Sequence, residues 1–276
     1  MSTDKYVKKY RGHADSINCV QFLTDGKNGK LISCSSDRTI RIWDKETEQL
    51  LETFLTPKEL LGFKVISASR IVAYSCSSVE LWNLKSASCS KTFEGHGEFI
   101  NSVEILTNNR IASCSNDRTV KVWSIRTGNC LATLKGHSKG VNCVKYVANN
   151  KIISCSHDKK IKVWDLKSNS CIMTLKGHRK AVTCLDLVSS SRIASASTDG
   201  VIKIWDLETG DCIQTFEFED DLSEMSQTED DDEEEKSVNI ISDDDYDDEE
   251  SLANNTFEYN EAMEEEETEI ISLHAF

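Results

Sequence analysis

Five tryptophans recur along the chain at a nearly constant spacing. Trp43, Trp82, Trp123, Trp164 and Trp205 are separated by intervals of 39, 41, 41 and 41 residues. A fixed period of about 40 residues indicates one supersecondary unit that is copied along the chain. Each copy needs its neighbours to bury its apolar face, so the copies stack side by side. The spacing therefore predicts a repeat protein.

Each copy contains four short strand-like segments separated by turn residues. In the fourth copy these segments span 141–147, 151–156, 160–164 and 171–175. In the third segment, Ile161 and Val163 flank Lys162, which is the period-two alternation of a half-buried strand. Four-stranded antiparallel units of this length, repeated, are the blades of a β-propeller. The sequence therefore predicts an all-β propeller.

A recurring motif makes the comparison with a known family possible. A Gly-His pair stands about thirty residues before Trp-Asp or Trp-Ser, with Ser-x-Ser-x-Asp between them, as in Gly136 to Asp165. This arrangement resembles the WD-repeat family over residues 6–216. The resemblance implies a buried hydrogen-bonded tetrad in each full blade. The matching sets are His13, Ser33, Asp37 and Trp43; His96, Ser113, Asp117 and Trp123; His137, Ser154, Asp158 and Trp164; and His178, Ser195, Asp199 and Trp205.

The tetrad residue types also occur in the catalytic triads of hydrolases. The number of copies separates the structural interpretation from the catalytic one. An enzyme needs one activated nucleophile in one pocket, whereas this set occurs four times in the same local context. The chain also lacks a Gly-x-Ser-x-Gly elbow, a Cys-x-x-Cys pair and a phosphate-binding loop. We therefore expect structural tetrads, with no catalytic residues, no metal site and no cofactor.

The charge of the chain is divided between two parts. Residues 217–276 hold 26 acidic residues and one basic residue, Lys236, for a net charge of −25, and residues 1–216 hold 21 acidic and 31 basic residues, for +10. Runs such as 229–235 and 243–250 repel themselves, and few apolar residues separate them. The sequence predicts a WD-repeat propeller over 1–216, followed by a disordered acidic tail over 217–276.

The eleven cysteines occupy repeated positions, which favours small strand hydrophobes over a disulfide framework. An odd cysteine count, no signal peptide and no long apolar run indicate a reducing compartment without a membrane anchor. We expect a cytoplasmic or nuclear protein.

The second copy departs from the pattern, and the number of copies is low for the family. Thr56-Pro57 stands where Gly-His is expected, and Ser77-Ser78 replaces the turn aspartate. We therefore expect a degenerate second blade without the tetrad, and the softest blade of the ring. Five blades leave three alternatives: a closed five-bladed ring, an open ring completed by another chain, or a fragment. The segment from Tyr6 to Tyr10 resembles an outer strand that could close the ring on the last blade.

Propellers of this family bind partners through the loops of one face. By the family pattern that face is lined by residues after each Gly-His pair and beside each turn aspartate, and functional residues concentrate in such loops. Its first and third copies carry Asp15 and Glu98, whereas the fourth and fifth carry basic residues. The candidate partner-binding residues are Phe99, Asn116, Arg118, Lys139, His157, Lys159, Arg179 and Lys180.

These observations favour a non-catalytic scaffold or adaptor that presents its propeller loops to peptide segments of other proteins. A basic sector suits an acidic or phosphorylated peptide, and it equally suits residues 229–250 of the chain's own tail in cis. Two alternatives stay open. The repeats look like those of F-box/WD substrate receptors of ubiquitin ligases, but no F-box precedes residue 6. The basic body also makes a chromatin or nucleic-acid-associated factor conceivable, although its Lys and Arg residues are spread through every blade.

Overall fold

A computed structural model of the protein describes residues 8–23, 29–107 and 109–217. All regular structure in these residues is β-strand, arranged in five antiparallel four-stranded sheets. Each sheet, or blade, contains four strands that are consecutive in the chain and paired in order. The predicted all-β class and the predicted four-stranded blades are confirmed. The expected acidic tail lies outside the described residues, except for its first residue, Glu217.

The strands follow the sequence repeats closely. Blade 1 contains β1 (Ile17–Leu23), β2 (Lys30–Ser35), β3 (Thr39–Asp44) and β4 (Leu50–Leu55). Blade 2 contains β5 (Gly62–Ser67), β6 (Arg70–Tyr74), β7 (Val79–Asn83) and β8 (Ser88–Phe93). Blade 3 contains β9 (Ile100–Leu106), β10 (Arg110–Ser115), β11 (Thr119–Ser124) and β12 (Cys130–Lys135). Blade 4 contains β13 (Val141–Tyr146), β14 (Lys151–Ser156), β15 (Lys160–Asp165) and β16 (Ser170–Lys176). Blade 5 contains β17 (Val182–Leu187), β18 (Arg192–Ser197), β19 (Val201–Asp206) and β20 (Cys212–Glu217).

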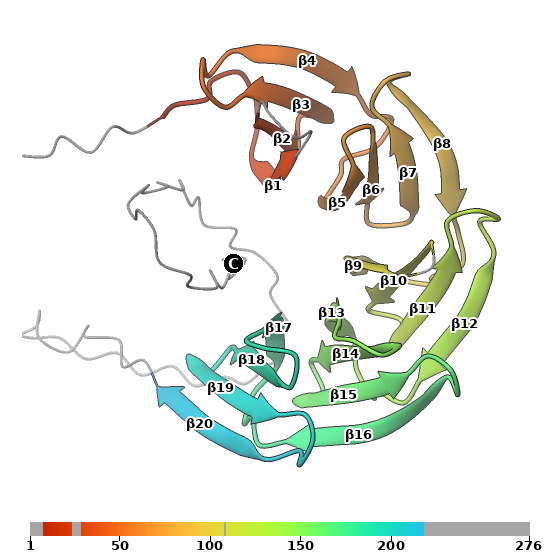
Figure 1. Ribbon diagram of the computed structural model, residues 1–276, viewed down its shortest axis with the longest axis vertical. Helices are drawn as coiled ribbons and strands as arrows, with labels where there is room; N and C mark the ends of the chain where they lie inside the picture. Colours follow the sequence, from red (N-terminus) through yellow and green to blue (C-terminus); the bar gives the residue numbers. More distant parts are fainter. Residues whose placement is uncertain (1–7, 24–28, 108, 218–276) are drawn as a thin grey trace, which may run out of the picture.

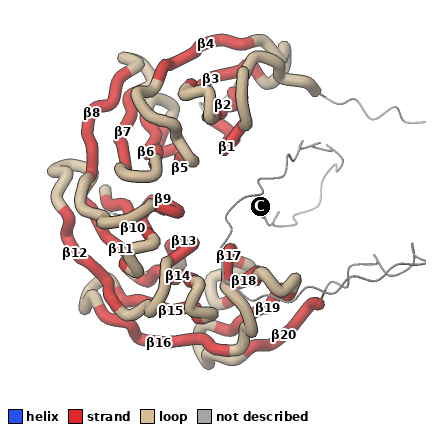
Figure 2. The backbone as a smooth tube through the Cα atoms, turned by 180° about the vertical axis from the view of Figure 1, so that it is seen from behind, coloured by secondary structure: helices blue, strands red, loops and turns tan. Residues whose placement is uncertain are grey.

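The five blades lie side by side along an open arc, with the first strand of each blade innermost (Figure 1). Inner strands contact one another in the order β1, β5, β9, β13 and β17. No comparable contact joins β17 back to β1 among the described residues. The view from behind shows the same gap between blades 1 and 5 (Figure 2).

The hydrophobic core lies between the blades. Each of its four clusters combines residues of two adjacent sheets. We call the side of a blade that packs on the preceding blade its leading face, and the opposite side its trailing face. In blade 4 the leading face presents Val141, Val144, Ile152 and Trp164 to blade 3. Its trailing face presents Cys143, Ile153, Cys155, Ile161, Val163 and Leu175 to blade 5. A blade is therefore apolar on both faces, and it needs two neighbours to be covered.

The described end of the N-terminal segment lies on blade 1. The Tyr10 hydroxyl donates to the carbonyl of Lys45 at 3.2 Å, and the backbone N–H of Lys9 donates to Glu48 at 3.2 Å. β20 pairs only with β19 in the described structure. The idea that this segment adds an outer strand to the last blade is therefore wrong for Lys8 to Tyr10. Residues 6 and 7 lie outside the described residues.

None of the eleven cysteines forms a disulfide. Cys34, Cys114 and Cys155 are buried, and burial raises the pKa of each of these thiols. They therefore behave as apolar strand residues. In the described part of the chain, no helix could span a membrane.

We expect the interblade cores to supply most of the stability. Leu134 is fully buried between blades 3 and 4, whereas Leu131 of the same strand is 52% exposed. Leu134→Ala should lower the free energy of unfolding by about 2–5 kcal/mol, because it leaves a cavity between two sheets. The matched control Leu131→Ala should change it by only about 0.5 kcal/mol. Urea unfolding monitored by tryptophan fluorescence measures both, and equal effects would contradict this assignment of the core.

Candidate functional site

The structure brings the four residues of three predicted tetrads into one hydrogen-bonded chain. In blade 4 the Trp164 indole N–H donates to Ser154 Oγ at 2.8 Å. Ser154 Oγ lies 2.9 Å from His137 Nε2, and His137 Nδ1 lies 2.9 Å from Asp158 Oδ2. Blades 1 and 3 repeat these contacts at 2.7–2.9 Å. Two strands and two loops of each blade are joined in this way.

The donors and acceptors of this hydrogen-bonded chain fit a neutral imidazole with its proton on Nδ1. Because the serine hydroxyl accepts from the indole, its own proton is available to His137 Nε2, and the Nδ1–H donates to the aspartate. Burial lowers the pKa of His96 and of His137, which agrees with this protonation state. A proton on His137 Nε2 would prevent the Ser154 hydroxyl from donating to this nitrogen. Ser154 is fully buried, so its hydroxyl serves these hydrogen bonds and is closed off from solvent.

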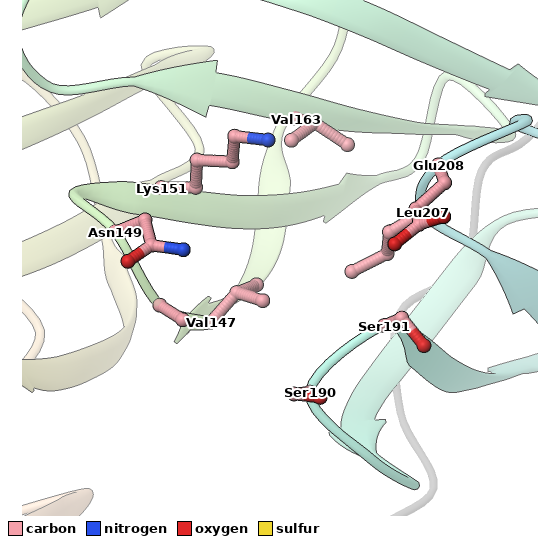
Figure 3. A pocket seen from close by; sticks show the side chains of 9 residues that line it. Val147, Asn149, Lys151, Val163, Ser190, Ser191, Leu207 and Glu208 are labelled. Carbon is pink, nitrogen blue, oxygen red and sulfur yellow. The ribbon is translucent and has the colours of Figure 1, made fainter.

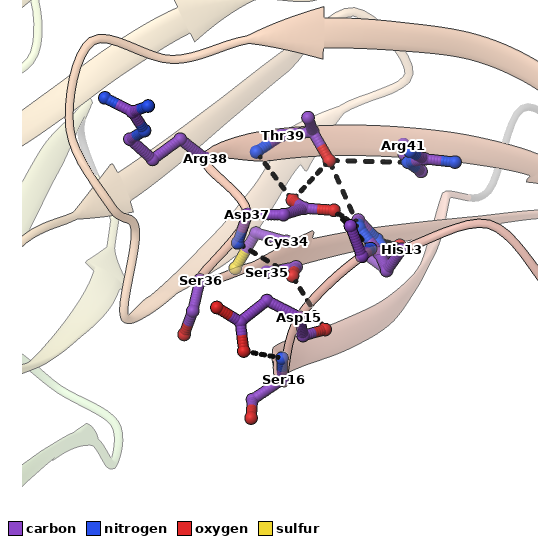
Figure 4. A network of polar contacts seen from close by, with 12 residues as sticks. His13, Asp15, Ser16, Cys34, Ser35, Ser36, Asp37, Arg38, Thr39 and Arg41 are labelled. Carbon is purple, nitrogen blue, oxygen red and sulfur yellow. Dashed lines mark hydrogen bonds and ion pairs between the residues drawn. The ribbon is translucent and has the colours of Figure 1, made fainter.

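The tetrad aspartate also holds the loop that precedes the inner strand. In blade 1, Asp37 Oδ2 accepts from His13 and from the backbone N–H of Ala14, while Oδ1 accepts from Thr39 (Figure 4). Burial alone would raise the pKa of Asp37, but the hydrogen bonds from Thr39, Ala14 and His13 outweigh it and lower the pKa. The Ser35 hydroxyl adds a bond to the carbonyl of Asp15 at 3.0 Å. The loop is therefore fastened at several points.

Blade 5 has an incomplete version of this network. Trp205, Ser195 and His178 are connected at 2.7–2.8 Å, as in the other blades. However, His178 Nδ1, Asp199 Oδ1 and Ser197 Oγ are buried without a hydrogen-bond partner. In blade 4 the counterpart of Ser197, Ser156, donates to the carbonyl of Lys139 at 3.1 Å. The loop at 178–181 is therefore less firmly held than its equivalents.

Blade 2 forms its sheet without the tetrad, as expected, but it contains a replacement that the sequence reasoning missed. The Trp82 indole donates to Glu80 Oε2 at 2.8 Å, and the Ser78 hydroxyl donates to Glu80 Oε1 at 3.1 Å. Ser78 also contacts Ser75 Oγ at 3.1 Å. Glu80 is buried, so it takes over the task of accepting the indole proton. The available signal was a glutamate two residues before the tryptophan, where the other blades have Arg or Lys.

The candidate binding residues lie in two adjoining loops of each blade. One loop precedes the inner strand and the other joins the second and third strands, and a backbone hydrogen bond connects them. In blade 3 the N–H of Asn116 donates to the carbonyl of Phe99 at 2.9 Å, and in blade 4 the N–H of His157 donates to that of Gly140 at 3.0 Å. We call the surface formed by these loops the turn face. Phe99 is 59% exposed on it.

Five cations lie in the loops of the turn face on blades 3 to 5. The basic sector consists of Arg118, Lys139, Lys159, Arg179 and Lys180, all of them exposed. None of them forms an ion pair with an acidic side chain among the described residues. His157, exposed beside Lys159, lies in the same region. The tetrad acid Asp158 points inward to His137, so it does not neutralise this surface.

Two asparagines on the inner strands, close to the turn face, connect neighbouring blades. Asn101 donates to the carbonyl of Val141 in the next blade at 2.8 Å, and Asn142 donates to that of Val182 at 2.7 Å. The candidate Asn116 is half-buried, and its side-chain oxygen accepts from Asn101 at 2.7 Å. The amides of Asn101 and Asn142 are thus occupied by interblade hydrogen bonds, and that of Asn116 by a contact within blade 3.

A row of alternating charges on the inner strands was not foreseen from the sequence. Lys64 of β5 pairs with Glu104 of β9 at 3.6 Å, and Lys145 of β13 pairs with Asp186 of β17 at 3.2 Å. These four residues occupy equivalent register positions. Burial raises the pKa of Glu104, and Lys64 and Lys145 oppose that shift. The row connects neighbouring blades at the inner rim.

One pocket of the described structure lies between two blades and is smaller than ordinary ligand pockets. A pocket of about 130 Å³ lies between blades 4 and 5, away from the turn face (Figure 3). It is lined by the loops around Asn149 and Ser190 and by Leu207. Ligand pockets are usually about 300–1,000 Å³. No group of three or more potential metal ligands occurs in residues 8–23, 29–107 and 109–217.

Comparison with known families agrees with this geometry. The family model described as "WD domain, G-beta repeat" matches residues 4–44, 87–124, 128–165 and 169–206, together 155 of the 276 residues. The chain belongs to the WD-repeat family. The predicted resemblance is therefore confirmed, and the degenerate second blade lies largely outside the matched segments. WD-repeat proteins typically act as non-catalytic scaffolds that bind other proteins.

Several curated WD-repeat relatives match part of the chain. The WD repeat-containing protein 89 homolog of Dictyostelium discoideum is 32% identical over 42% of this chain and 32% of its own length. The pre-mRNA-splicing factor cwf17 of Schizosaccharomyces pombe is 29% identical over 35% of this chain and 28% of its own length. The nuclear distribution protein PAC1 of Candida albicans is 26% identical over 41% and 24%, respectively. The chain thus spans a third or less of the length of these relatives.

The complete tetrad of blade 4 and the incomplete tetrad of blade 5 give a matched pair of substitutions. Asp158→Ala should lower the free energy of unfolding by about 1–3 kcal/mol, because it leaves the buried His137 N–H without an acceptor. Asp199→Ala should cost less, because Asp199 makes no hydrogen bond to His178. Urea unfolding of both variants measures the difference, and an equal or larger cost for Asp199→Ala would contradict the description of blade 5.

The tetrads also predict that acid destabilises the fold. The folded pKa of His96, His137 and His178 lies below the ordinary value of 6.5 because of burial, so the unfolded chain binds more protons below that pH. Asp117 and Asp158 have lowered pKa values and add a further loss at more acidic pH. We expect the free energy of unfolding to fall between pH 7 and pH 5, as measured by urea titrations.

Glu104 provides an internal check on this prediction. Its pKa is raised, so its protonation favours the folded state as the pH falls, against the effect of the histidines. Glu104→Gln should therefore make the acid-induced loss of stability steeper. A loss that becomes shallower in this variant, or an intact chain that is equally stable at pH 7 and pH 5, would refute the account.

Proposed function

We propose that this WD-repeat protein is a non-catalytic interaction scaffold whose basic sector binds an acidic or phosphorylated peptide segment of another protein. The observation that carries the proposal is the concentration of Arg118, Lys139, Lys159, Arg179 and Lys180 on one part of the turn face without acidic partners. Guanidinium and ammonium groups form their strongest hydrogen bonds with carboxylates and phosphates. Phe99, exposed on blade 3 beside the turn that carries Arg118, supplies an aromatic anchor at the edge of the sector.

The backbone of the turns supports a binding role for two of these cations. Arg118 and Lys159 follow the turn aspartates and adopt positive φ values of 68° and 69°. Blade 5 has Gly200 at the equivalent position, with φ of 74°. Left-handed conformations cost a non-glycine residue about 1–2 kcal/mol, so glycine suits the turn better. Long basic side chains at strained positions are therefore consistent with a task other than stability.

The acidic segment at residues 229–250 is one ligand of the required chemistry. It lies outside the described residues, and its composition alone connects it to the basic sector. Held on the same chain, such a segment acts at a high effective concentration and competes with partners in trans. The same sector would suit a partner's acidic peptide equally well. Relatives named as a nuclear distribution protein and as a splicing factor fit a cytoplasmic or nuclear setting.

Peptide binding tests this proposal. The probe is a synthetic peptide of residues 229–250, with and without a phosphate on Ser242, titrated by fluorescence anisotropy into the chain ending at Glu217. Arg118→Gly with Lys159→Gly should weaken binding about tenfold through lost charge-assisted contacts. The same double variant should be as stable as the parent or more stable, because glycine relieves the backbone strain.

A charge-matched variant on the opposite edge of the blades serves as the control. Lys151→Gln with Lys167→Gln removes two exposed cations that lie away from the turn face, and it should leave peptide binding unchanged. The full chain should bind the peptide more weakly than the shortened chain if the tail competes in cis. Equal binding by both double variants would refute the basic sector as the site.

A further inference from the structure

The two ends of the arc expose faces that are buried at every internal junction. On the leading face of blade 1, Ile17 is 52% and Val20 is 50% exposed. Their register equivalents in blade 4, Val141 and Val144, are 0% exposed because blade 3 covers them. The gap in Figure 1 lies directly beside β1. Blade 1 therefore has a leading face built for a preceding blade.

The trailing face of blade 5 has the complementary property. Ile202, Ile204 and Phe216 occupy the register positions of Ile161, Val163 and Leu175 in blade 4. Those three residues of blade 4 are almost fully buried, whereas Phe216 is 41% exposed and the two isoleucines are half-buried. The arc thus ends in one free leading face, on blade 1, and one free trailing face, on blade 5. Faces of these two kinds pack together at every internal junction.

Tyr10 already occupies the place where the outer strand of a preceding blade would end. Its ring lies 5.9 Å from the ring of Trp43 in an edge-to-face arrangement. Phe93, the last residue of β8, contacts Trp123 of the following blade in the same way at 6.0 Å. Each aromatic stands two residues before the glycine of its Gly-His pair. The chain therefore enters blade 1 as it would enter from another blade.

We propose that the gap between blades 5 and 1 is a docking site for a four-stranded β-sheet blade, or a pair of blades, supplied by a partner protein. This surface is distinct from the turn face. The four internal junctions show which kind of surface covers each free face: an antiparallel sheet with apolar residues on both sides. A second copy of this chain is a separate outcome, which the test below distinguishes as a homodimer.

The inner rim adds a requirement for the incoming sheet. Lys64, Glu104, Lys145 and Asp186 alternate in charge along the inner strands and end with a carboxylate on blade 5. A blade that continues the row presents a Lys or Arg at the equivalent position of its innermost strand. The partner is thus a sheet with β-branched and aliphatic residues on both faces and a basic residue at the inner rim.

Extra blades added in cis test whether the ends accept such sheets. A second copy of residues 136–217, which form blades 4 and 5, is inserted after Glu217 in the full chain. We expect amide hydrogen exchange in β17 to β20 of the original blade 5 to slow by at least about tenfold, because a neighbour now covers it. Ile204→Asp on the original blade 5 should abolish this protection, whereas Ile213→Asp on its exposed outer strand should not. Unchanged exchange after the insertion would overturn the proposal.

Occupation by a partner is tested with the same variants. The tagged full chain is isolated from cells after chemical crosslinking, and its mass and retained proteins are determined. The proposal expects a retained protein that crosslinks to blades 1 and 5, that is lost with the inserted blades and with Ile204→Asp, and that persists with Ile213→Asp. A protein still retained by the chain with inserted blades, a homodimer that Ile204→Asp dissociates, or a monomer without any retained protein would each overturn it.

Discussion

The structure depends on one constraint: every blade is apolar on both faces, so each blade is stable only when it is packed between two others. The four clusters of the core all lie at junctions between sheets, and none lies within a single blade. Stability in such a molecule is a sum of interactions between nearest neighbours. Blades 2, 3 and 4 satisfy the constraint on both sides. Blades 1 and 5 satisfy it on one side, so we expect the ends of the arc, and not the degenerate second blade, to be the least stable part.

The polar networks have a different task, which is to hold the binding loops on the sheets. The tetrad aspartate faces inward and fastens its loop, and the next residue faces outward on a left-handed turn. A single turn thus separates the residue that stabilises the fold from the residue available to partners. In blades 3 and 4 the outward residues are Arg118 and Lys159, and with the loop lysines and arginines they give the turn face its basic sector. The scaffold role follows from this division.

Much of this arrangement could be predicted from the sequence, because it is encoded locally in each repeat. The tryptophan period gave the number of blades, and the spacing of Gly-His, Ser and Asp predicted the residues that the tetrads bring together. The replacement of the tetrad by Glu80 was missed, because it uses a residue type outside the family pattern. The openness of the arc and the unsatisfied atoms of blade 5 could not be predicted with certainty. The openness of the arc depends on the curvature accumulated over five sheets, and the hydrogen bonds of blade 5 depend on how its loop sits against its own turn; a single repeat motif encodes neither.

Amide hydrogen exchange across the whole intact chain tests the central claim most directly. If neighbour packing determines stability, the central strands of blades 3 and 4 should exchange most slowly, and those of blades 1 and 5 should exchange faster. Blade 2, which lacks the tetrad but is covered on both faces, should resemble blades 3 and 4. Blade 5 exchanging as slowly as blade 4 would contradict the account, since it would mean that the ends of the arc are covered. A blade 2 that exchanges fastest would instead show that the tetrad, and not the neighbouring blade, limits stability.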